Sequence, residues 1–242
     1  MSAAHSSPPA FVTTRWTQVI AAGGTGENAS VALSELCGQY YQPVVTFLRC
    51  SGHPDDHARE LAHEFFARLL ANPSIGNADP TRGRFRSYLL AAVKHFVADQ
   101  RDRANAAKRG QSLEHVELKP ATDTSPGVDP PDETLRSSEK EFDRQWALTI
   151  LGQALDQLAE EHATTNKTRL FETLKPWLTG DSEALTQKEA AEQLGMNEGA
   201  IKVAIHRLRK RFRALVKDAV AQTVPGEANV NDELGYLISV IG

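Results

Sequence analysis

The sequence contains few of the residues from which anchors and covalent frameworks are built. Among its 242 residues there are two cysteines, Cys37 and Cys50, and both lie in helical patterns, so the sequence predicts neither a disulfide framework nor a cysteine-based metal site. No apolar run approaches membrane-spanning length, and the N-terminus lacks the apolar core of a signal peptide. These absences predict a cytoplasmic protein with no membrane partner.

Signals for catalysis and for cofactors are also missing. The glycine-rich segment 23–26 is not followed by the Lys-Ser/Thr of a phosphate-binding loop, so we interpret it as a turn. Glu60 and His63 form an E-x-x-H pair of the kind that binds iron in helical bundles, but the sequence has no second such pair. We therefore expect no enzyme activity, no metal site and no cofactor.

Charge is distributed unevenly along a chain of ordinary composition. Hydrophobic residues make up 40% of the sequence, and the formal net charge is −4. Residues 82–109 hold eight basic residues and two acidic ones, whereas residues 111–143 hold nine acidic residues and three basic ones. Residues 200–217 hold seven basic residues and no acidic residue. The two basic blocks are candidates for nucleic-acid binding, although the net charge is negative.

The segment 185–217 has the pattern of two helices joined by a tight turn. Thr186 and Glu189 are spaced as an S/T-x-x-E capping box at the start of the first helix. Gly195 suits the left-handed conformation that ends this helix, and Asn197 can cap the second helix. The apolar positions of the second helix recur at helical spacing: Ile201, Ile205, Leu208, Phe212 and Leu215. The pattern predicts a DNA-binding helix-turn-helix.

The second helix of this pattern carries seven basic residues. Cations along a helix bind phosphate without sequence choice, whereas side chains at the N-terminal end of a recognition helix reach base edges. The candidates for base contact are Asn197, Glu198, Lys202, Val203 and His206. The candidates for phosphate contact are Arg207, Arg209, Lys210, Arg211 and Arg213. The alternative is a solvated basic helix that packs only on its neighbours.

The first basic block combines cations with aromatic rings. Bases of single-stranded DNA stack on such rings, at about 1–3 kcal/mol each, while Arg and Lys follow the backbone. Tyr88 is the best candidate for stacking, whereas Phe96 is better explained as a core residue. The candidate contacts with melted DNA in this block are Arg84, Arg86, Tyr88, Lys94, Arg101 and Arg103.

Residues 53–73 predict an amphipathic helix that begins after Asp55 or Asp56. Its apolar stripe consists of Ala58, Leu61, Ala62, Phe65 and Leu69. Its polar stripe consists of His57, Glu60, Glu64 and Arg68.

Taken in order, these three segments resemble the sigma factors of bacterial RNA polymerase, of the extracytoplasmic-function group. GMNEGAIKVAIHRLRKRFR looks like the C-terminal promoter-binding domain of that family. Ala58, Glu60, Leu61, Glu64 and Phe66 match the motif Asp-Ala-Glu-Asp-Leu-x-Gln-Glu-x-Phe, from which the chain departs at His57, Arg59 and His63. Phe85, Arg86, Leu89, Asp99 and Arg103 match the segment that opens the minus-ten promoter element, with Tyr88 for Trp and Lys94-His95 for Arg-Asn.

The resemblance spans roughly residues 33–220 and implies a transcription initiation factor that is not an enzyme. The amphipathic helix within residues 53–73 would bind the clamp helices of the polymerase β′ subunit, through His57, Glu60, His63, Glu64 and Arg68. The first basic block, with His95 added, would bind and melt the minus-ten element, and the helix-turn-helix would bind the minus-thirty-five element. The implied partners are core RNA polymerase, through its β′ clamp helices and its β flap, promoter DNA, and an anti-sigma factor.

The organisation predicted from these features is an all-α fold with two helical domains joined by a flexible acidic linker. The N-terminal domain covers residues 1–110, and the proline-containing linker covers residues 111–135. The C-terminal domain covers residues 136–224 and contains the helix-turn-helix. Residues 225–242 form a tail helix.

Two further expectations concern helix ends. Pro43 predicts a break between one helix that ends near Tyr40 and a second helix through Val44. In the tail, one apolar stripe recurs at helical spacing, and Asn229 or Asn231 can cap its start. The stripe consists of Val230, Leu234, Leu237, Ile238 and Ile241. A helix this short must dock to be stable, and we expect it to dock within the chain. The alternatives are docking on an outside partner and a disordered tail.

A second function is compatible with the same helix-turn-helix. A repressor or activator could bind duplex DNA through it and never contact RNA polymerase. The amphipathic helix within residues 53–73 and the aromatic-basic block favour a sigma factor, because such a regulator needs neither.

Overall fold

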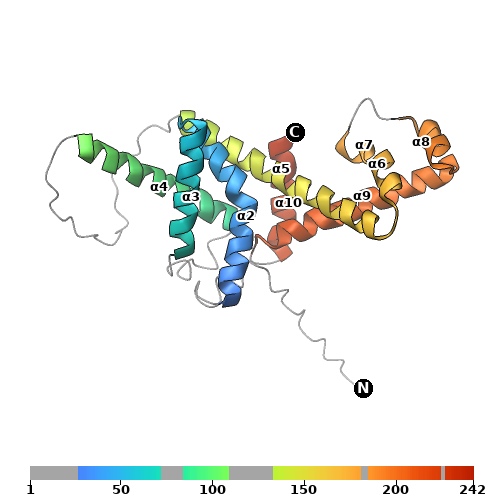
Figure 1. The fold of residues 1–242 in the computed structure, drawn as a ribbon, viewed down its shortest axis with the longest axis horizontal. Helices are drawn as coiled ribbons and strands as arrows, with labels where there is room; N and C mark the ends of the chain where they lie inside the picture. The colour runs from blue at the N-terminus through green and yellow to red at the C-terminus, as the bar shows by residue number, and fades with distance from the viewer. Residues whose placement is uncertain (1–26, 72–83, 109–132, 181–184, 225–226) are drawn as a thin grey trace, which may run out of the picture. The chain divides into compact units, whose positions relative to one another are not determined.

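The computed structural model describes residues 27–71, 84–108, 133–180, 185–224 and 227–242. Every regular element within them is a helix, so the predicted all-α class is confirmed (Figure 1). The chain divides into two compact units, and the boundary falls between Trp146 and Ala147. None of the helices in these residues is long and apolar enough to cross a membrane.

The described residues of the first unit form three complete helices and the beginning of another. They are α2 (Glu27–Cys50), α3 (Asp55–Ala71), α4 (Phe85–Lys108) and the first part of α5 (Glu133–Thr164). Helix α2 packs against α3, and Phe65 of α3 contacts Phe96 of α4 with 5.6 Å between ring centroids. Phe96 is therefore a core residue, as predicted.

Aromatic rings join α2, α4 and α5 in the core of this unit. The ring of Tyr40 lies edge-on to Phe85 at 5.1 Å and stacks on Phe142 at 6.3 Å, measured between centroids. Phe47 meets Phe142 edge-on at 6.5 Å. All four rings are fully buried. Because Phe142 belongs to α5, the first part of this helix completes the core of the first unit.

The helix break predicted at Pro43 is wrong. Helix α2 runs without interruption from Glu27 to Cys50, with Pro43 inside it. Proline removes one helical hydrogen bond, at a cost of about 3 kcal/mol. The residues on either side, Tyr40, Val44 and Phe47, are fully buried, and this burial holds the helix together across the proline.

The unit boundary differs from the predicted domain boundary. The linker predicted at 111–135 lies mostly outside the described residues, and its last three residues begin α5. Residues 136–146, which we assigned to the C-terminal domain, belong to the first unit. The reason is the burial of Ser138, Phe142 and Trp146, which places this part of α5 in the first core.

The second unit is built around the helix-turn-helix. Its described residues form the rest of α5, α6 (Thr168–Leu174), α7 (Pro176–Thr179), α8 (Gln187–Leu194), α9 (Glu198–Ala221) and α10 (Glu227–Ile241). Helices α6 and α8 contact each other, as do α7 and α9 and also α8 and α9. Buried residues of α6 and α9, among them Phe171, Ile201 and Ile205, form the support beneath the turn.

The predicted tail helix is present as α10 and contacts α9. It begins at Glu227, before both asparagines that we predicted as its cap. Val230 and Leu237 of the predicted stripe are buried, but Ile238 is 70% exposed and Ile241 is also exposed. The expectation of docking within the chain is confirmed, and only part of the stripe is used for it.

Candidate nucleic-acid interface

The turn between α8 and α9 has the geometry predicted from its sequence. The Glu189 amide donates to Thr186 Oγ1 at 3.2 Å, and the Thr186 amide donates to Glu189 Oε2 at 2.7 Å, which closes the capping box. Hydrogen bonds from Thr186 lower the pKa of the Glu189 carboxyl. Gly195 ends α8 in the left-handed region, at φ 65°, and Asn197 Oδ1 accepts from the Ala200 amide at 2.7 Å. The capping box therefore sets the start of α8, and Gly195 and Asn197 set the turn and the start of α9.

Helix α9 has a buried face and an exposed face. Ile201, Ile205, Leu208 and Leu215 are buried as predicted, whereas Phe212 is half-buried. The five candidates for base contact are all exposed at the start of the helix: Asn197, Glu198, Lys202, Val203 and His206. Val203 is 50% exposed and lies next to Lys202. An exposed apolar side chain there suits contact with the methyl group of thymine.

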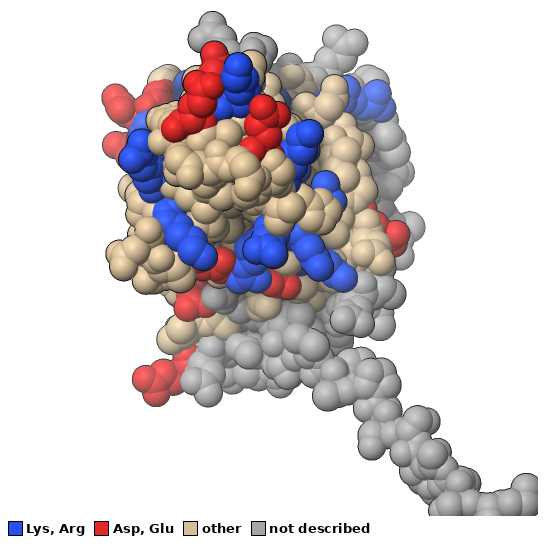
Figure 2. Space-filling model, turned by 90° about the vertical axis from the view of Figure 1, so that its right-hand side faces the viewer, with Lys and Arg blue, Asp and Glu red and all other residues tan. Residues whose placement is uncertain are grey.

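The exposed face of this end of the unit has a mixed charge distribution. Figure 2 views the side on which α6, α7, α8 and the start of α9 lie, and Lys and Arg side chains surround an uncharged area there. Acidic side chains lie at the top of this view and also between the Lys and Arg side chains in its lower part. The predicted phosphate contacts on α9 are all exposed: Arg207, Arg209, Lys210, Arg211 and Arg213.

A groove of about 690 Å³ runs along the same part of α9. Leu170, Leu174, Met196 and Val203 form its apolar lining. Cations line it as well, at Lys167, Arg207 and Arg211. Val203, the apolar candidate for base contact, therefore lines the same groove as Arg207 and Arg211, two candidates for phosphate contact.

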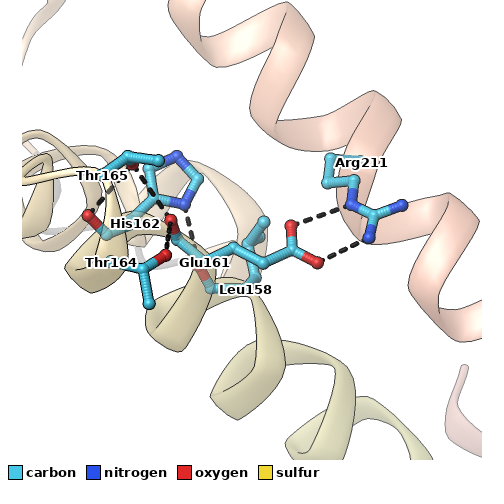
Figure 3. A network of polar contacts seen from close by, with 6 residues as sticks. All are labelled: Leu158, Glu161, His162, Thr164, Thr165 and Arg211. Atoms are coloured by element: carbon cyan, nitrogen blue, oxygen red, sulfur yellow. Dashed lines mark hydrogen bonds and ion pairs between the residues drawn. The ribbon is translucent and has the colours of Figure 1, made fainter.

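Two of the predicted phosphate contacts already have protein partners. The Arg209 guanidinium donates to the Trp177 carbonyl from Nε at 3.2 Å and from Nη2 at 3.1 Å. Arg211 binds both carboxylate oxygens of Glu161 on α5, from Nε at 2.9 Å and from Nη2 at 2.5 Å (Figure 3). These hydrogen bonds lower the pKa of the Glu161 carboxyl, which therefore stays ionised. The sequence contains no local signal for either partner.

The first basic block is only partly available on α4. Lys94, His95, Arg101 and Arg103 are exposed, and Arg84 is half-buried. Lys94 and Arg101 are seven residues apart and share a helix face, whereas Arg103 lies on the opposite side of the helix from Lys94. Of the four exposed candidates on α4, the structure therefore places Lys94 and Arg101 on one side of the helix. Lys94 Nζ donates to Glu139 Oε1 of α5 at 2.5 Å.

Arg86 is not at the surface, so its assignment as a DNA contact is wrong for this structure. Its side chain is 8% exposed and forms an ion pair with Asp143 of α5, which is equally buried. Its guanidinium also lies over the Trp146 ring, 5.3 Å from the centroid. The burial of Phe85 beside it turns the start of α4 toward the core.

Tyr88 is half-buried, with its ring 6.3 Å from that of Phe85. Burial raises the pKa of its phenol, and the nearby Cys37 raises it further. The ring is attached to the core, and part of it remains accessible for the predicted stacking.

The polar stripe predicted on α3 divides into two parts. His57 Nδ1 lies 3.6 Å from Glu60 Oε2, and the two side chains are 53% and 78% exposed. Glu64 instead forms an ion pair with Arg68 and accepts from Gln100 of α4 at 2.9 Å. The Arg68 guanidinium lies over the Phe96 ring, 5.2 Å from the centroid.

His63, which the resemblance added to this surface, is exposed. Its Nε2 lies 3.0 Å from the Tyr41 hydroxyl of α2, and the two rings stack at 5.3 Å. Glu60 is thus the most exposed of these side chains, and Glu64 and Arg68 remain 42% and 44% exposed.

The described residues contain no group of three or more His, Cys, Asp or Glu side chains that could hold a metal ion. Cys37 is buried, and burial raises the pKa of its thiol to about 12, so it is unreactive as a nucleophile.

Comparisons with protein-family models, with curated proteins and with solved structures each give no match. The functional interpretation therefore depends on the residues and contacts given above.

Proposed function

We propose that this protein is a transcription initiation factor of the sigma type, which recruits core RNA polymerase to promoters and assists their melting. The observation that carries the proposal is the helix-turn-helix of α8 and α9. Its capping box, its glycine turn and its exposed basic α9 have the form that duplex DNA recognition requires. The resemblance of the sequence to extracytoplasmic-function sigma factors supports the same conclusion.

In this proposal the two units bind different parts of a promoter. The start of α9 reads base edges of an upstream duplex element through Lys202, Val203 and His206, which are exposed together. Helix α4 binds the melted strand, with Lys94 and Arg101 near the backbone and Tyr88 available for stacking. The protein would act in the cytoplasm without a cofactor.

Helix α3 supplies the proposed surface for polymerase. Glu60 is the most informative residue for a test, because its side chain is 78% exposed and a substitution there leaves the core unchanged. We expect Glu60→Lys to weaken the binding of the purified chain to core RNA polymerase by at least about tenfold, the effect of 1.4 kcal/mol. Asp156→Lys on α5 is the matched control, since it makes the same charge change at another exposed acid.

The experiment is a titration of labelled chain with core polymerase, with circular dichroism to verify that both variants are folded. Equal affinities for wild type and both variants would reject the proposed role of α3. If the wild type itself does not bind core polymerase, the protein is not a sigma factor. The helix-turn-helix would then point to a regulator that binds duplex DNA alone.

A further inference from the structure

Three residues assigned to nucleic-acid contact form ion pairs with acids of one helix. Lys94 pairs with Glu139, Arg86 with Asp143, and Arg211 with Glu161. All three acids belong to α5. The first two pairs lie within the first unit and the third lies within the second unit, so α5 meets candidate cations in both.

The three pairs differ in their access to solvent, and this difference separates their roles. The side chains of Arg86 and Asp143 are each 8% exposed, so this pair belongs to the core. In the Lys94–Glu139 pair the exposures are 42% and 33%, and in the Arg211–Glu161 pair they are 47% and 34%. A phosphate group can reach the two exposed cations and replace their carboxylate partners, because such exposed pairs contribute little stability.

The Glu161 carboxylate is well placed to hold Arg211. It occupies two donors of the guanidinium at once, in the same fork geometry by which arginine binds a phosphate group. The hydroxyls of Thr164 and Thr165 each donate to the main-chain carbonyl of Glu161 at 3.0 Å, which stabilises the backbone from which this side chain extends. Figure 3 shows the carboxylate directed from this turn toward α9.

We propose that α5 is an intramolecular competitor for nucleic acid, in which Glu161 holds Arg211 away from duplex phosphate and Glu139 holds Lys94 away from the melted strand. This inference rests on the proposed function and adds that acidic residues of α5 limit the binding of DNA. DNA must displace the carboxylates before these cations bind phosphate, so the free chain binds DNA more weakly than its basic residues alone would allow.

If Glu161 positions Arg211 rather than competing with DNA, its substitution will change the DNA affinity in the opposite direction. If Glu161 instead orients Arg211 for phosphate, its removal will weaken DNA binding. A competitor that is removed will strengthen binding, and the gain must depend on Arg211. The sign of the change and its dependence on Arg211 therefore distinguish competition from positioning.

The test measures binding of the full chain to a labelled duplex of mixed sequence, by fluorescence anisotropy at about 50 mM salt, where phosphate contacts dominate. Glu161→Gln should raise the affinity by about two- to fivefold, the range expected for opening one exposed ion pair. Glu160→Gln removes the same charge from the neighbouring exposed position and should have a smaller effect. In the Arg211→Ala background, Glu161→Gln should give no more gain than Glu160→Gln.

The same design applies to the first unit with a labelled single strand. Glu139→Gln should raise the affinity, and Glu141→Gln is its control, because Glu141 pairs with Arg144 of its own helix. Unchanged or weaker binding by both Glu161→Gln and Glu139→Gln overturns the competitor role while leaving the proposed function intact. No binding of either DNA by any protein, wild type included, overturns both.

Discussion

The buried pair of Arg86 and Asp143 allows a quantitative test of how α5 is attached to the first unit. Each side chain is 8% exposed, so removal of one takes an ion-pair partner from a charge that stays buried. This loss costs about 3–5 kcal/mol in comparable pairs. We therefore expect Asp143→Asn to lower the free energy of unfolding of the first unit by that amount. The double variant Arg86→Met/Asp143→Leu should recover most of it, because apolar side chains replace buried pairs without net loss.

The assay is urea unfolding of the full chain, followed by fluorescence of Trp146. Phe at the other two tryptophans, Trp16 and Trp177, makes Trp146 the sole reporter, and it lies beneath the Arg86 guanidinium. Glu141→Gln on the same helix is the control and should change the free energy of unfolding by less than about 1 kcal/mol. A loss below about 1 kcal/mol in Asp143→Asn, or a double variant as unstable as the single one, would refute the buried pair as the attachment of α5.

Three other predictions follow from the second unit. Thr186→Ala should destabilise the unit by about 0.5–2 kcal/mol through loss of the capping box, measured by thermal unfolding, and an unchanged midpoint would contradict the role of the cap. Leu237→Ala should cost about 2–5 kcal/mol if α10 is a permanent part of the unit, whereas the exposed Ile238→Ala should cost little; equal effects would mean that α10 is not docked. Lys202→Ala should change the preference at one or two promoter positions by about 1–3 kcal/mol, whereas Arg213→Ala should weaken all sequences alike. Identical profiles on a panel of single-base variants would show that α9 is oriented differently.

The helix-turn-helix could be predicted from sequence because its determinants are local. Thr186 with Glu189, and Asn197 with the Ala200 amide, are pairs three residues apart, and Gly195 acts through its own backbone angle. Such features depend on spacing and residue type, which are present in the sequence itself.

The ion pairs of α5 could not be predicted in the same way. Arg86 and Asp143 are 57 residues apart, Lys94 and Glu139 are 45 apart, and Arg211 and Glu161 are 50 apart. Periodicity shows which residues share a helix face, but it does not show which helices meet. The position of Arg86 among aromatic residues therefore predicts a DNA contact, although packing places this arginine in the core.

Packing also overrode two local rules. Pro43 lies inside α2 because the buried residues around it compensate for the missing hydrogen bond. Residues 136–146 follow an acidic, proline-containing segment and looked like the start of a second domain. Phe142 instead fills the first core, and this depends on the shape left by Tyr40 and Phe47.

The most direct test of the central claim is transcription by purified core RNA polymerase, with and without this chain, on a library of randomised promoter sequences. The proposal predicts transcripts that depend on the chain and that share two elements upstream of their start sites, one duplex and one melted. Core polymerase that transcribes a tailed control template, yet yields no chain-dependent transcript from the library, would contradict the assignment as a sigma factor.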